Sequence, residues 1–321
     1  MTRVLVLMGG PDAERAVSLE SGRAIAAALR EARRWTVTEH LIDAATPDGA
    51  FPGGLRDARS RFDVVFPALH GRWGEGGPLQ QILEDAGIPF VGSLAPGALL
   101  AMDKMATKER LAARGVRTPE AQIIAADDSL LLDPPLVIKP VDDGSSVDLR
   151  ICRTPAEVID ARACLHPKRG RLLAERYIRG REVTQGVVGH RVLPLIEIIP
   201  AAEYYDYEAK YHRDDTQYFI DPDVTDRVRD QCAGAARIAM TELGLRDLAR
   251  LDFIVDDRGA WLLEVNTMPG FTSHSLVPKA ARHAGMEMPA LCSLLVDMAL
   301  VRGSDRVTDP AARPSSRCRV P

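Results

Sequence analysis

The sequence predicts a protein of the α/β class with α+β parts, in which an N-terminal parallel sheet is followed by smaller mixed units. Three observations support this prediction. The 321 residues are enough for two or three domains at about 150 residues each. Apolar strands and amphipathic helices alternate over the first ~95 residues, which is typical of a parallel βαβ sheet. Beyond residue 118 the predicted strands are short and have few helices between them.

The N-terminal domain is predicted over residues 1–95 and is expected to be Rossmann-like. Its elements are, in order, a strand over 3–8, a helix over 18–33, a strand over 63–69, a helix over 78–86 and a strand over 88–91. The helix over 18–33 has Leu19, Ile25 and Leu29 on one apolar face. Because ligands bind at the carboxyl ends of parallel strands, the loops after these strands are candidates for function.

A central domain is predicted over 96–180 and a C-terminal domain over 181–308. The central elements are a helix over 98–114, short strands over 121–124, 136–139, 149–152 and 172–177, and a helix over 155–164. The C-terminal elements are strands over 184–188 and 192–199, a helix over 224–243, a hairpin of strands 248–255 and 260–265, and a helix over 278–300. Residues 309–321 have three prolines and no periodicity, so we expect a disordered tail.

The composition is that of an ordinary globular protein and argues against several classes. The net charge of −4 gives no basis for nucleic-acid binding by bulk electrostatics. No apolar run approaches the ~20 residues of a membrane span. The five cysteines are odd in number and include no CxxC pair, which argues against a disulfide framework or a zinc site. We therefore expect a cytoplasmic protein without nucleic-acid or membrane partners.

Lysine is rare among the basic residues. Of the 41 basic residues only six are lysine. Because the two side chains differ in shape and hydration, a position that keeps lysine in this arginine-rich chain is a candidate for a compact ammonium at a functional site. These positions are Lys104, Lys108, Lys139, Lys168, Lys210 and Lys279.

The hairpin near the C-terminus carries polar residues in otherwise apolar strands. Arg250 and Asp252 lie in its first strand, and Glu264 and Asn266 lie in its second, so each pair points to one face. If paired residue numbers sum to 516, Asp252 lies opposite Glu264 and Arg250 lies opposite Asn266. The converging carboxylate and amide oxygens would then suit Mg²⁺, which would also relieve the repulsion of the carboxylates. A surface hairpin with exposed polar faces is the alternative.

The strand over 136–139 ends in Lys139 and leads into a turn that contains Gly144, Ser145 and Ser146. Backbone N–H groups and hydroxyls in such a turn can bind phosphate oxygens, and Lys139 adds a point charge. The pattern is not the P-loop GxxxxGK[ST]. A flexible connection is the alternative interpretation.

Further candidates have simpler interpretations that stay open. His70 begins a glycine-rich segment after a buried strand, and Glu14 follows the first strand. The tyrosine-rich segment 205–211 is a candidate lid. After the hairpin, Gly270 could present its N–H to an oxyanion and Ser275 could hold a carboxylate. A packed histidine, a solvated glutamate, a surface loop and a helix cap are the respective alternatives.

Together these segments resemble the D-alanine–D-alanine ligases of the ATP-grasp superfamily. The matching segments are GGPDAERAVSLESG (9–22), HGRWGEGG (70–77), MDKMATK (102–108), VIKPVDDGSSV (137–147), ERYIRGREV (175–183), YDYEAKY (205–211), ARLDF (249–253) and LLEVNTMPGFTSHSLVP (262–278). They follow the family's order and cover residues 3 to about 300. The resemblance implies an ATP-grasp fold of three α/β or α+β domains, with ATP held between the second and the third.

The resemblance implies that two groups of residues bind ATP and metal. The implied ATP-binding residues are Lys104, Lys139, Ser146, Glu175, Glu182 and Lys210, with Lys210 at the γ-phosphate and the two glutamates beside adenine and ribose. Asp252, Glu264 and Asn266 are implied to hold two Mg²⁺ ions, for which Mn²⁺ can substitute.

The remaining implied roles concern the amino-acid substrates. Glu14 is implied to hold the ammonium of the first D-alanine and to form a hydrogen-bonded group with Ser145 and Tyr211. Arg250 and the Gly270 N–H are implied to form an oxyanion site. The implied substrate-binding residues are His70 at the first D-alanine and Ser275 with the Leu276 N–H at the carboxylate of the second.

The implied activity is the ATP-dependent joining of two D-alanines through an acyl phosphate, for peptidoglycan synthesis, by a homodimer formed through the N-terminal domain. One alternative is a related ligase for other amino acids in specialised metabolism or antibiotic self-resistance. Another is a nucleotide-binding protein without catalysis. The presence of five residues argues against it: Lys210, Arg250, Asp252, Glu264 and Asn266. The chain departs from the usual pattern at Gly76, where an acidic residue is common, and at Asp148, where glycine is common. Asp148 adds a negative charge near the expected phosphate loop, which counts against tight ATP binding.

Overall fold

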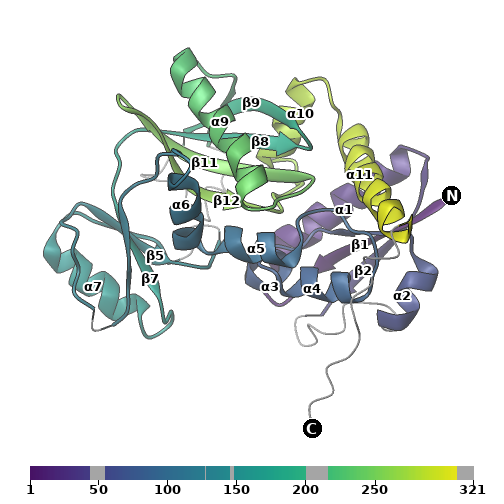
Figure 1. Ribbon diagram of the computed structural model, residues 1–321, viewed down its shortest axis with the longest axis horizontal. Helices are drawn as coiled ribbons and strands as arrows, with labels where there is room; N and C mark the ends of the chain where they lie inside the picture. Colours follow the sequence, from purple (N-terminus) through teal and green to yellow (C-terminus); the bar gives the residue numbers. More distant parts are fainter. Residues whose placement is uncertain (44–54, 127, 145–147, 200–215, 309–321) are drawn as a thin grey trace, which may run out of the picture.

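The structure is a computed structural model that describes residues 1–43, 55–126, 128–144, 148–199 and 216–308. The predicted tail over 309–321 lies outside these residues. The described strands form three sheets. Figure 1 shows the sheet that carries α7 at one end of the molecule and the N-terminal sheet at the other, with the C-terminal sheet between and above them.

The N-terminal sheet is parallel and has the strand order β2-β1-β3. Its strands are β1 (Thr2–Gly9), β2 (Trp35–Ile42) and β3 (Val64–Pro67). The run from Val4 to Met8 in β1 is buried, as expected for the central strand of a parallel sheet covered on both faces. Helix α1 (Arg15–Glu31) packs on β1 and β2. The expected strand over 88–91 is only a bridge between Phe90 and Val65, because Pro89 has no N–H for a longer ladder.

Short helices surround this sheet. They are α2 (Leu55–Arg61), α3 (Gly71–Glu75) and α4 (Pro78–Asp85). Neither α2 nor β2 was predicted from the sequence. For β2 the reason is that it mixes polar residues with apolar ones, because several of its positions are exposed at the edge of the sheet. Helix α3 begins directly after His70, so the glycine-rich segment starts a helix rather than an open loop.

The helix predicted over 98–114 is instead two helices, α5 (Ala95–Met102) and α6 (Lys104–Ala112). Asp103 separates them because its backbone is extended and its Oδ1 accepts the Ala106 N–H at 2.9 Å. Aspartate is a strong N-cap, so it begins a new helix here. Lys104 therefore becomes the first residue of α6 and is buried.

The central sheet is antiparallel, in the order β4-β7-β5-β6, and α7 (Pro155–Leu165) packs on it. Its strands are β4 (Ala121–Ile124), β5 (Leu136–Pro140), β6 (Arg150–Cys152) and β7 (Leu172–Arg176). A capping box of Thr154 and Glu157 begins α7. These elements match the predicted ones to within a few residues.

The C-terminal sheet is antiparallel, in the order β10-β9-β8-β11-β12. Its strands are β8 (Arg181–Val188), β9 (Arg191–Ile199), β10 (Gln217–Ile220), β11 (Leu248–Asp256) and β12 (Gly259–Asn266). Helix α9 (Asp226–Glu242) packs on one face and α10 (Leu276–His283) on the other.

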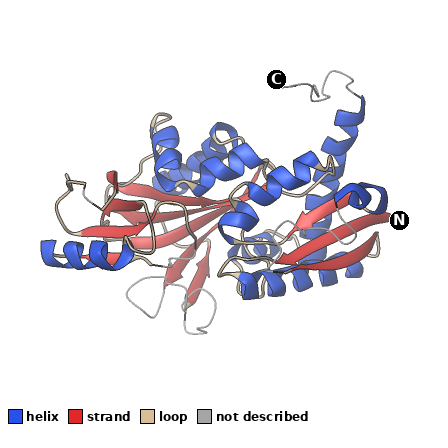
Figure 2. Cartoon of the chain, turned by 90° about the horizontal axis from the view of Figure 1, so that it is seen from below, coloured by secondary structure: helices blue, strands red, loops and turns tan. Residues whose placement is uncertain are grey.

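The last predicted helix, over 278–300, is also two helices. Helix α10 ends before Gly285, whose φ of +80° favours glycine, and α11 (Met288–Thr308) leaves at 105° to it. Figure 2 shows α11 running along the N-terminal part of the molecule, and it packs on α1. No single helix among the described residues is long and apolar enough to span a membrane; only the bent pair of α10 and α11 reaches that length and composition.

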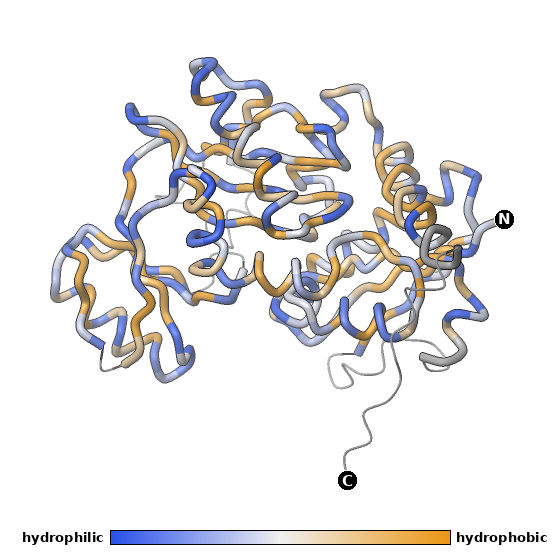
Figure 3. The backbone as a smooth tube through the Cα atoms, in the orientation of Figure 1, coloured by the Kyte–Doolittle hydropathy of each residue, from blue (hydrophilic) through white to orange (hydrophobic). Residues whose placement is uncertain are grey.

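The N-terminal and C-terminal regions share one hydrophobic core. Val4 and Phe66 of the N-terminal sheet belong to the same buried cluster as Leu276 of α10 and Leu295 of α11. The Phe271 ring, in the loop after β12, packs edge-to-face on Phe66 with ring centres 5.5 Å apart. Figure 3 shows hydrophobic residues along the strands and hydrophilic residues at many of the peripheral turns. The loop after the hairpin is thus fixed against the N-terminal sheet.

Candidate active site

The hairpin of β11 and β12 pairs its polar residues in the register that was one possibility from the sequence. Asp252 pairs with Glu264, and Arg250 pairs with Asn266. An irregularity between Asp252 and Phe253 shifts the pairing by one residue, so that the short turn still closes at Asp256 and Gly259. The bulge therefore reconciles the tight turn with the pairing of the two carboxylates.

Cations already neutralise the two carboxylates of the hairpin. Arg250 donates from Nε and Nη2 to the two oxygens of Asp252, at 3.0 and 2.8 Å, and Thr184 Oγ1 donates to Asp252 Oδ1 at 2.6 Å. Lys104 Nζ lies 3.4 Å from Glu264 Oε2. Asn266 Oδ1 accepts the Met268 N–H at 2.9 Å.

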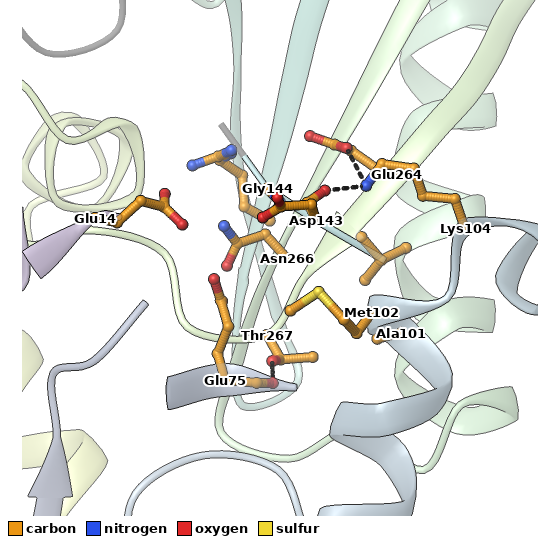
Figure 4. A pocket seen from close by; sticks show the side chains of 12 residues that line it. Glu14, Glu75, Ala101, Met102, Lys104, Asp143, Gly144, Glu264, Asn266 and Thr267 are labelled. Atoms are coloured by element: carbon orange, nitrogen blue, oxygen red, sulfur yellow. Dashed lines mark hydrogen bonds and ion pairs between the residues drawn. The ribbon is translucent and has the colours of Figure 1, made fainter. Parts of the chain in front are cut away.

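These oxygens lie along two adjoining pockets. The first is lined by Glu14, Glu75, Ala101, Met102, Lys104, Asp143, Gly144, Arg250, Glu264, Val265, Asn266 and Thr267. It is built from all three regions of the chain, and Figure 4 shows Glu14, Glu75 and Asn266 pointing into it from different sides.

The second pocket lies between β5 of the central sheet and the C-terminal sheet. It is lined by Lys104, Lys139, Pro140, Asp143, Gly144, Leu149, Glu182, Asp252, Leu263 and Glu264. Asp252 faces this pocket, Asn266 faces the first, and Glu264 and Lys104 line both. Two ammonium groups beside carboxylates make the second pocket suited to phosphates and their cations.

The donor set at this junction fits Mg²⁺ by its chemistry. Asp252 and Glu264 offer carboxylate oxygens and Asn266 an amide oxygen, the ligands that Mg²⁺ prefers. Within the described part of the chain, no three His, Cys, Asp or Glu side chains gather as a metal site. A metal here would therefore take only part of its coordination from the described acidic side chains, which is the usual arrangement for Mg²⁺ beside phosphates.

Glu175 lies behind the second pocket rather than in its wall. It is 2% exposed, and its carboxylate binds Lys139 Nζ at 2.9 Å and also Lys108 Nζ. Burial alone would raise the pKa of Glu175, but the two ammonium groups outweigh it and lower the pKa. Burial lowers the pKa of Lys108. Sequence reasoning missed the role of Lys108, although its place in the MDKMATK segment and the rarity of lysine could have indicated it.

Comparison with known proteins decides the family. The family model for the D-Ala–D-Ala ligase C-terminus matches residues 113–297, and that for the N-terminus matches residues 47–93. The chain belongs to the D-alanine–D-alanine ligase family. It is 40% identical to the D-alanine–D-alanine ligase of Chromohalobacter salexigens over 92% of this chain and 93% of that protein. It is 41% identical to that of Bordetella petrii over 92% of each chain.

Solved structures agree with this family assignment. The crystal structure of the Bacillus anthracis D-alanine–D-alanine ligase complexed with ATP has a TM-score of 0.80 and 29% identity, over 95% of this chain and 99% of that chain. The fold is the ATP-grasp fold of these ligases, as the sequence resemblance implied.

His70, expected near the first substrate of a ligase, is buried and lines neither pocket. Its Nδ1 lies 3.0 Å from the Met268 carbonyl oxygen, and its Nε2 lies 3.5 Å from Ser21 Oγ. Because a carbonyl only accepts, Nδ1 carries the proton. Burial lowers the pKa of His70 to about 4, so the ring is neutral at pH 7. The histidine links helix α1 to the loop after β12.

Glu75 lines the first pocket and was not singled out from the ligase motif HGRWGEGG. It is 5% exposed, and its carboxylate accepts the N–H groups of Gly71 and Met268, each at 3.2 Å. Burial and the nearby Glu14 carboxylate raise its pKa well above the usual range. An acidic residue within a glycine-rich segment was the signal that could have indicated it.

Glu14 and Gly144 face each other across the first pocket. A Cβ built on Gly144 would lie 3.3 Å from Glu14 Oε2, so the glycine permits a close approach of the two segments. Arg72 of α3 forms an ion pair with Asp142 at 3.1 Å beside this contact. Ser145, which the ligase resemblance groups with Glu14, lies outside the described residues, as do Ser146, Lys210 and Tyr211.

Gly270, Ser275 and Leu276 lie together at the start of α10, outside both pocket walls. A Cβ built on Gly270 would lie 2.7 Å from Ser275 Oγ, so the backbone approaches this hydroxyl closely. Ser275 Oγ accepts the Thr272 N–H at 2.9 Å. Ser275 is the N-cap residue of α10, and the Leu276 N–H is among the first of that helix.

Proposed function

We propose that this chain joins two D-alanine molecules with the consumption of ATP, forming D-alanyl-D-alanine for peptidoglycan synthesis. The observation that supports this most strongly is the adjoining pair of pockets, in which Glu264 and Lys104 line both walls. One pocket has the lysines and carboxylates suited to ATP, and the other has carboxylates suited to an amino acid's ammonium. Because the chain belongs to the ligase family, we assign one pocket to ATP and the other to the amino acid.

In the first step, a carboxylate oxygen of the first D-alanine attacks the γ-phosphorus of ATP, and ADP leaves, which gives an acyl phosphate. We place the phosphates beside Lys104 and Lys139, with Glu182 at the ribose. Asp252, Glu264 and Asn266 would hold Mg²⁺ here, which would offset negative charge as anions approach. Glu175 would act through Lys139 and Lys108 by holding the two ammonium groups in place.

In the second step, the amine of the second D-alanine attacks the acyl carbon, phosphate leaves, and the nitrogen loses a proton. Glu14 would hold the ammonium of the first D-alanine. Arg250 and the Gly270 N–H would stabilise the oxyanion, and Asp252 orients the Arg250 guanidinium through two hydrogen bonds. Ser275 and the Leu276 N–H would hold the carboxylate of the second substrate at the N-terminus of α10.

The proposal includes residues outside the described ranges. Ser146 and Lys210 would contact the phosphates, and Ser145 and Tyr211 would complete the hydrogen-bonded group with Glu14. His70 would act beside the first substrate by holding Ser21 and the Met268 carbonyl in place. The homodimer through the N-terminal domain, the cytoplasmic location and the use of Mn²⁺ in place of Mg²⁺ are parts of the same proposal.

The test is phosphate release from ATP in the presence of Mg²⁺, with and without D-alanine. We expect release that depends on D-alanine, together with D-alanyl-D-alanine detected by mass spectrometry. A panel of other D- and L-amino acids is the control for substrate choice. Release that follows another amino acid would identify a related ligase instead, and nucleotide binding without any release would contradict an enzymatic function.

A further inference from the structure

Arg169 forms ion pairs with two aspartates that stand on either side of residues 145–147. Its Nη1 lies 2.8 Å from Asp143 Oδ2, and its Nε lies 2.9 Å from Asp148 Oδ2. The Arg169 backbone is held in turn, since its N–H donates to the Leu165 carbonyl at the end of α7 at 2.8 Å. About a third of the Arg169 side chain is exposed. One guanidinium therefore serves two carboxylates from a fixed backbone position.

The two aspartates border the pocket that we assign to ATP. Asp143 lines both pockets, and its carbonyl oxygen accepts a hydrogen bond from Lys104 Nζ. Asp148 directly precedes Leu149, which lines the second pocket beside Lys139. Without a counter-charge, both carboxylates would repel an incoming polyphosphate.

The backbone of Asp148 shows that this residue carries a conformational penalty as well as a charge. Its φ is +59°, in the left-handed region that favours glycine, although aspartate tolerates it better than most side chains. The Asp148 carboxylate forms an ion pair and a hydrogen bond with Arg169. Arg169 thus neutralises the charge of Asp148, which stands at a position whose backbone favours glycine.

We propose that Arg169 is a positioning residue for the nucleotide site: it neutralises Asp143 and Asp148 and fixes the distance between them, so that ATP enters beside Lys104 and Lys139. The proposal rests on the proposed function, because it requires the second pocket to bind ATP. On this proposal the pairing with Arg169 reduces the repulsion of ATP that was expected from Asp148.

The test measures binding of a non-hydrolysable ATP analogue with Mg²⁺ by titration calorimetry, on the full chain. We expect Arg169→Ala to weaken binding about tenfold, because two carboxylates lose their counter-charge. Asp148→Gly removes one carboxylate and suits the backbone, so it should bind as tightly as wild type or more tightly. Asp148→Gly with Arg169→Ala should lie between the two single variants. Arg150→Ala, which removes an exposed arginine from the neighbouring strand, is the matched control and should bind as wild type.

Two further readouts separate charge compensation from a purely structural role. The binding defect of Arg169→Ala should shrink at about 1 M salt, where the Debye length is about 3 Å. In steady-state assays, its KM for ATP should rise about tenfold while kcat at saturating ATP stays within about twofold of wild type. A thermal melt like that of Arg150→Ala establishes that the variant is folded.

Several outcomes would overturn the proposal. Wild-type affinity for the ATP analogue in folded Arg169→Ala would do so. Equally weakened affinity in Asp148→Gly and Arg169→Ala would also do so, because both changes break the same ion pair but alter the charge in opposite directions. A fall in kcat without a change in KM would also count against it. If wild type binds the analogue but releases no phosphate with D-alanine, the proposed ligase activity fails while the role of Arg169 is still judged from binding. If wild type binds no nucleotide, both are wrong.

Discussion

At the scale of single residues, the site depends on side chains that contact partners far away in the sequence. Glu75 accepts the N–H of Met268, and Lys108 pairs with Glu175. Neither partner is visible from local sequence, because the contact forms only when separate elements fold together. Arg250 and Asp252 are the exception, since alternation along one strand places both on one face.

Replacing Arg250 by alanine should separate binding from catalysis. We expect nucleotide affinity within about threefold of wild type, because the lysines remain, and turnover reduced about 100- to 1000-fold, because an oxyanion donor is lost. Calorimetry with an ATP analogue and D-alanine-dependent phosphate release measure the two effects. Arg229→Ala, which breaks an exposed ion pair with Asp221, is the control and should leave both unchanged. Wild-type turnover in Arg250→Ala would refute its assigned role.

His70 should make stability depend on pH. Its pKa in the folded state is about 4, below the usual 6.5, so the unfolded chain takes up a proton first as the pH falls. The contribution of His70 is therefore fully present above pH 6.5 and is lost progressively down to about pH 4. Between pH 7.5 and pH 5, His70→Gln should lose about 2 kcal/mol less of its free energy of unfolding than wild type. Urea denaturation at both pH values measures this.

The exposed residue His190 provides the comparison for that experiment. His190→Gln makes the same substitution outside the core, so it controls for the chemical change itself. Equal pH dependence in wild type and His70→Gln would show that the buried ring does not contribute.

At the scale of elements, the position of a helix start determines which lysine enters the site. Asp103 begins α6, and Lys104 is therefore its first residue, where its ammonium reaches Glu264. A continuous helix over 98–114, as the apolar periodicity suggested, would direct Lys104 elsewhere. Apolar periodicity indicates which face of a helix is buried, but it does not indicate where one helix ends and the next begins. The capping hydrogen bond of Asp103 marks that point.

Asp103→Ala should therefore affect both stability and nucleotide binding. Loss of the cap should lower the free energy of unfolding by about 1 kcal/mol and raise the KM for ATP about threefold or more, since Lys104 becomes less well fixed. Thr225→Ala is the matched control, because Thr225 caps α9 through the Val228 N–H and lines neither pocket. It should lose similar stability without a change in KM. The idea fails if both variants change KM equally.

At the scale of the whole molecule, one buried carboxylate joins three parts of the chain. Asp247, just before β11, accepts the Gly92 N–H at 2.7 Å and binds Arg302 of α11 at 2.5 and 2.7 Å. Burial raises the pKa of Asp247, and Arg302 opposes that rise. The contact joins the loop at Gly92 to the start of β11 and to α11.

Arg302→Ala should leave a charge buried without its partner. We expect the free energy of unfolding to fall by about 3 kcal/mol and the KM for D-alanine to rise, because the two walls of the first pocket are less well fixed. Arg282→Ala, which removes an exposed ion pair with Glu287, should lower the free energy of unfolding by less than about 1 kcal/mol. Denaturation and steady-state kinetics check both variants. Equal stability of the two would contradict this role for Asp247.

The sequence by itself indicated the family, the ATP-grasp fold and the shared face of Arg250 and Asp252, because motifs and alternation are local properties of the chain; the register that pairs Asp252 with Glu264 was one possibility, and the bulge in the structure decides it. The breaks within the helices expected over 98–114 and 278–300 have local causes, the Asp103 cap and Gly285, which apolar periodicity does not detect. Only the tertiary structure decided that Glu175 lies behind the pocket, that His70 is buried beside Met268, and that one arginine joins Asp143 to Asp148. The physical reason is that burial, ion pairing and the direction of a helix depend on segments tens to hundreds of residues apart, and these interactions exist only after the sheets have packed together.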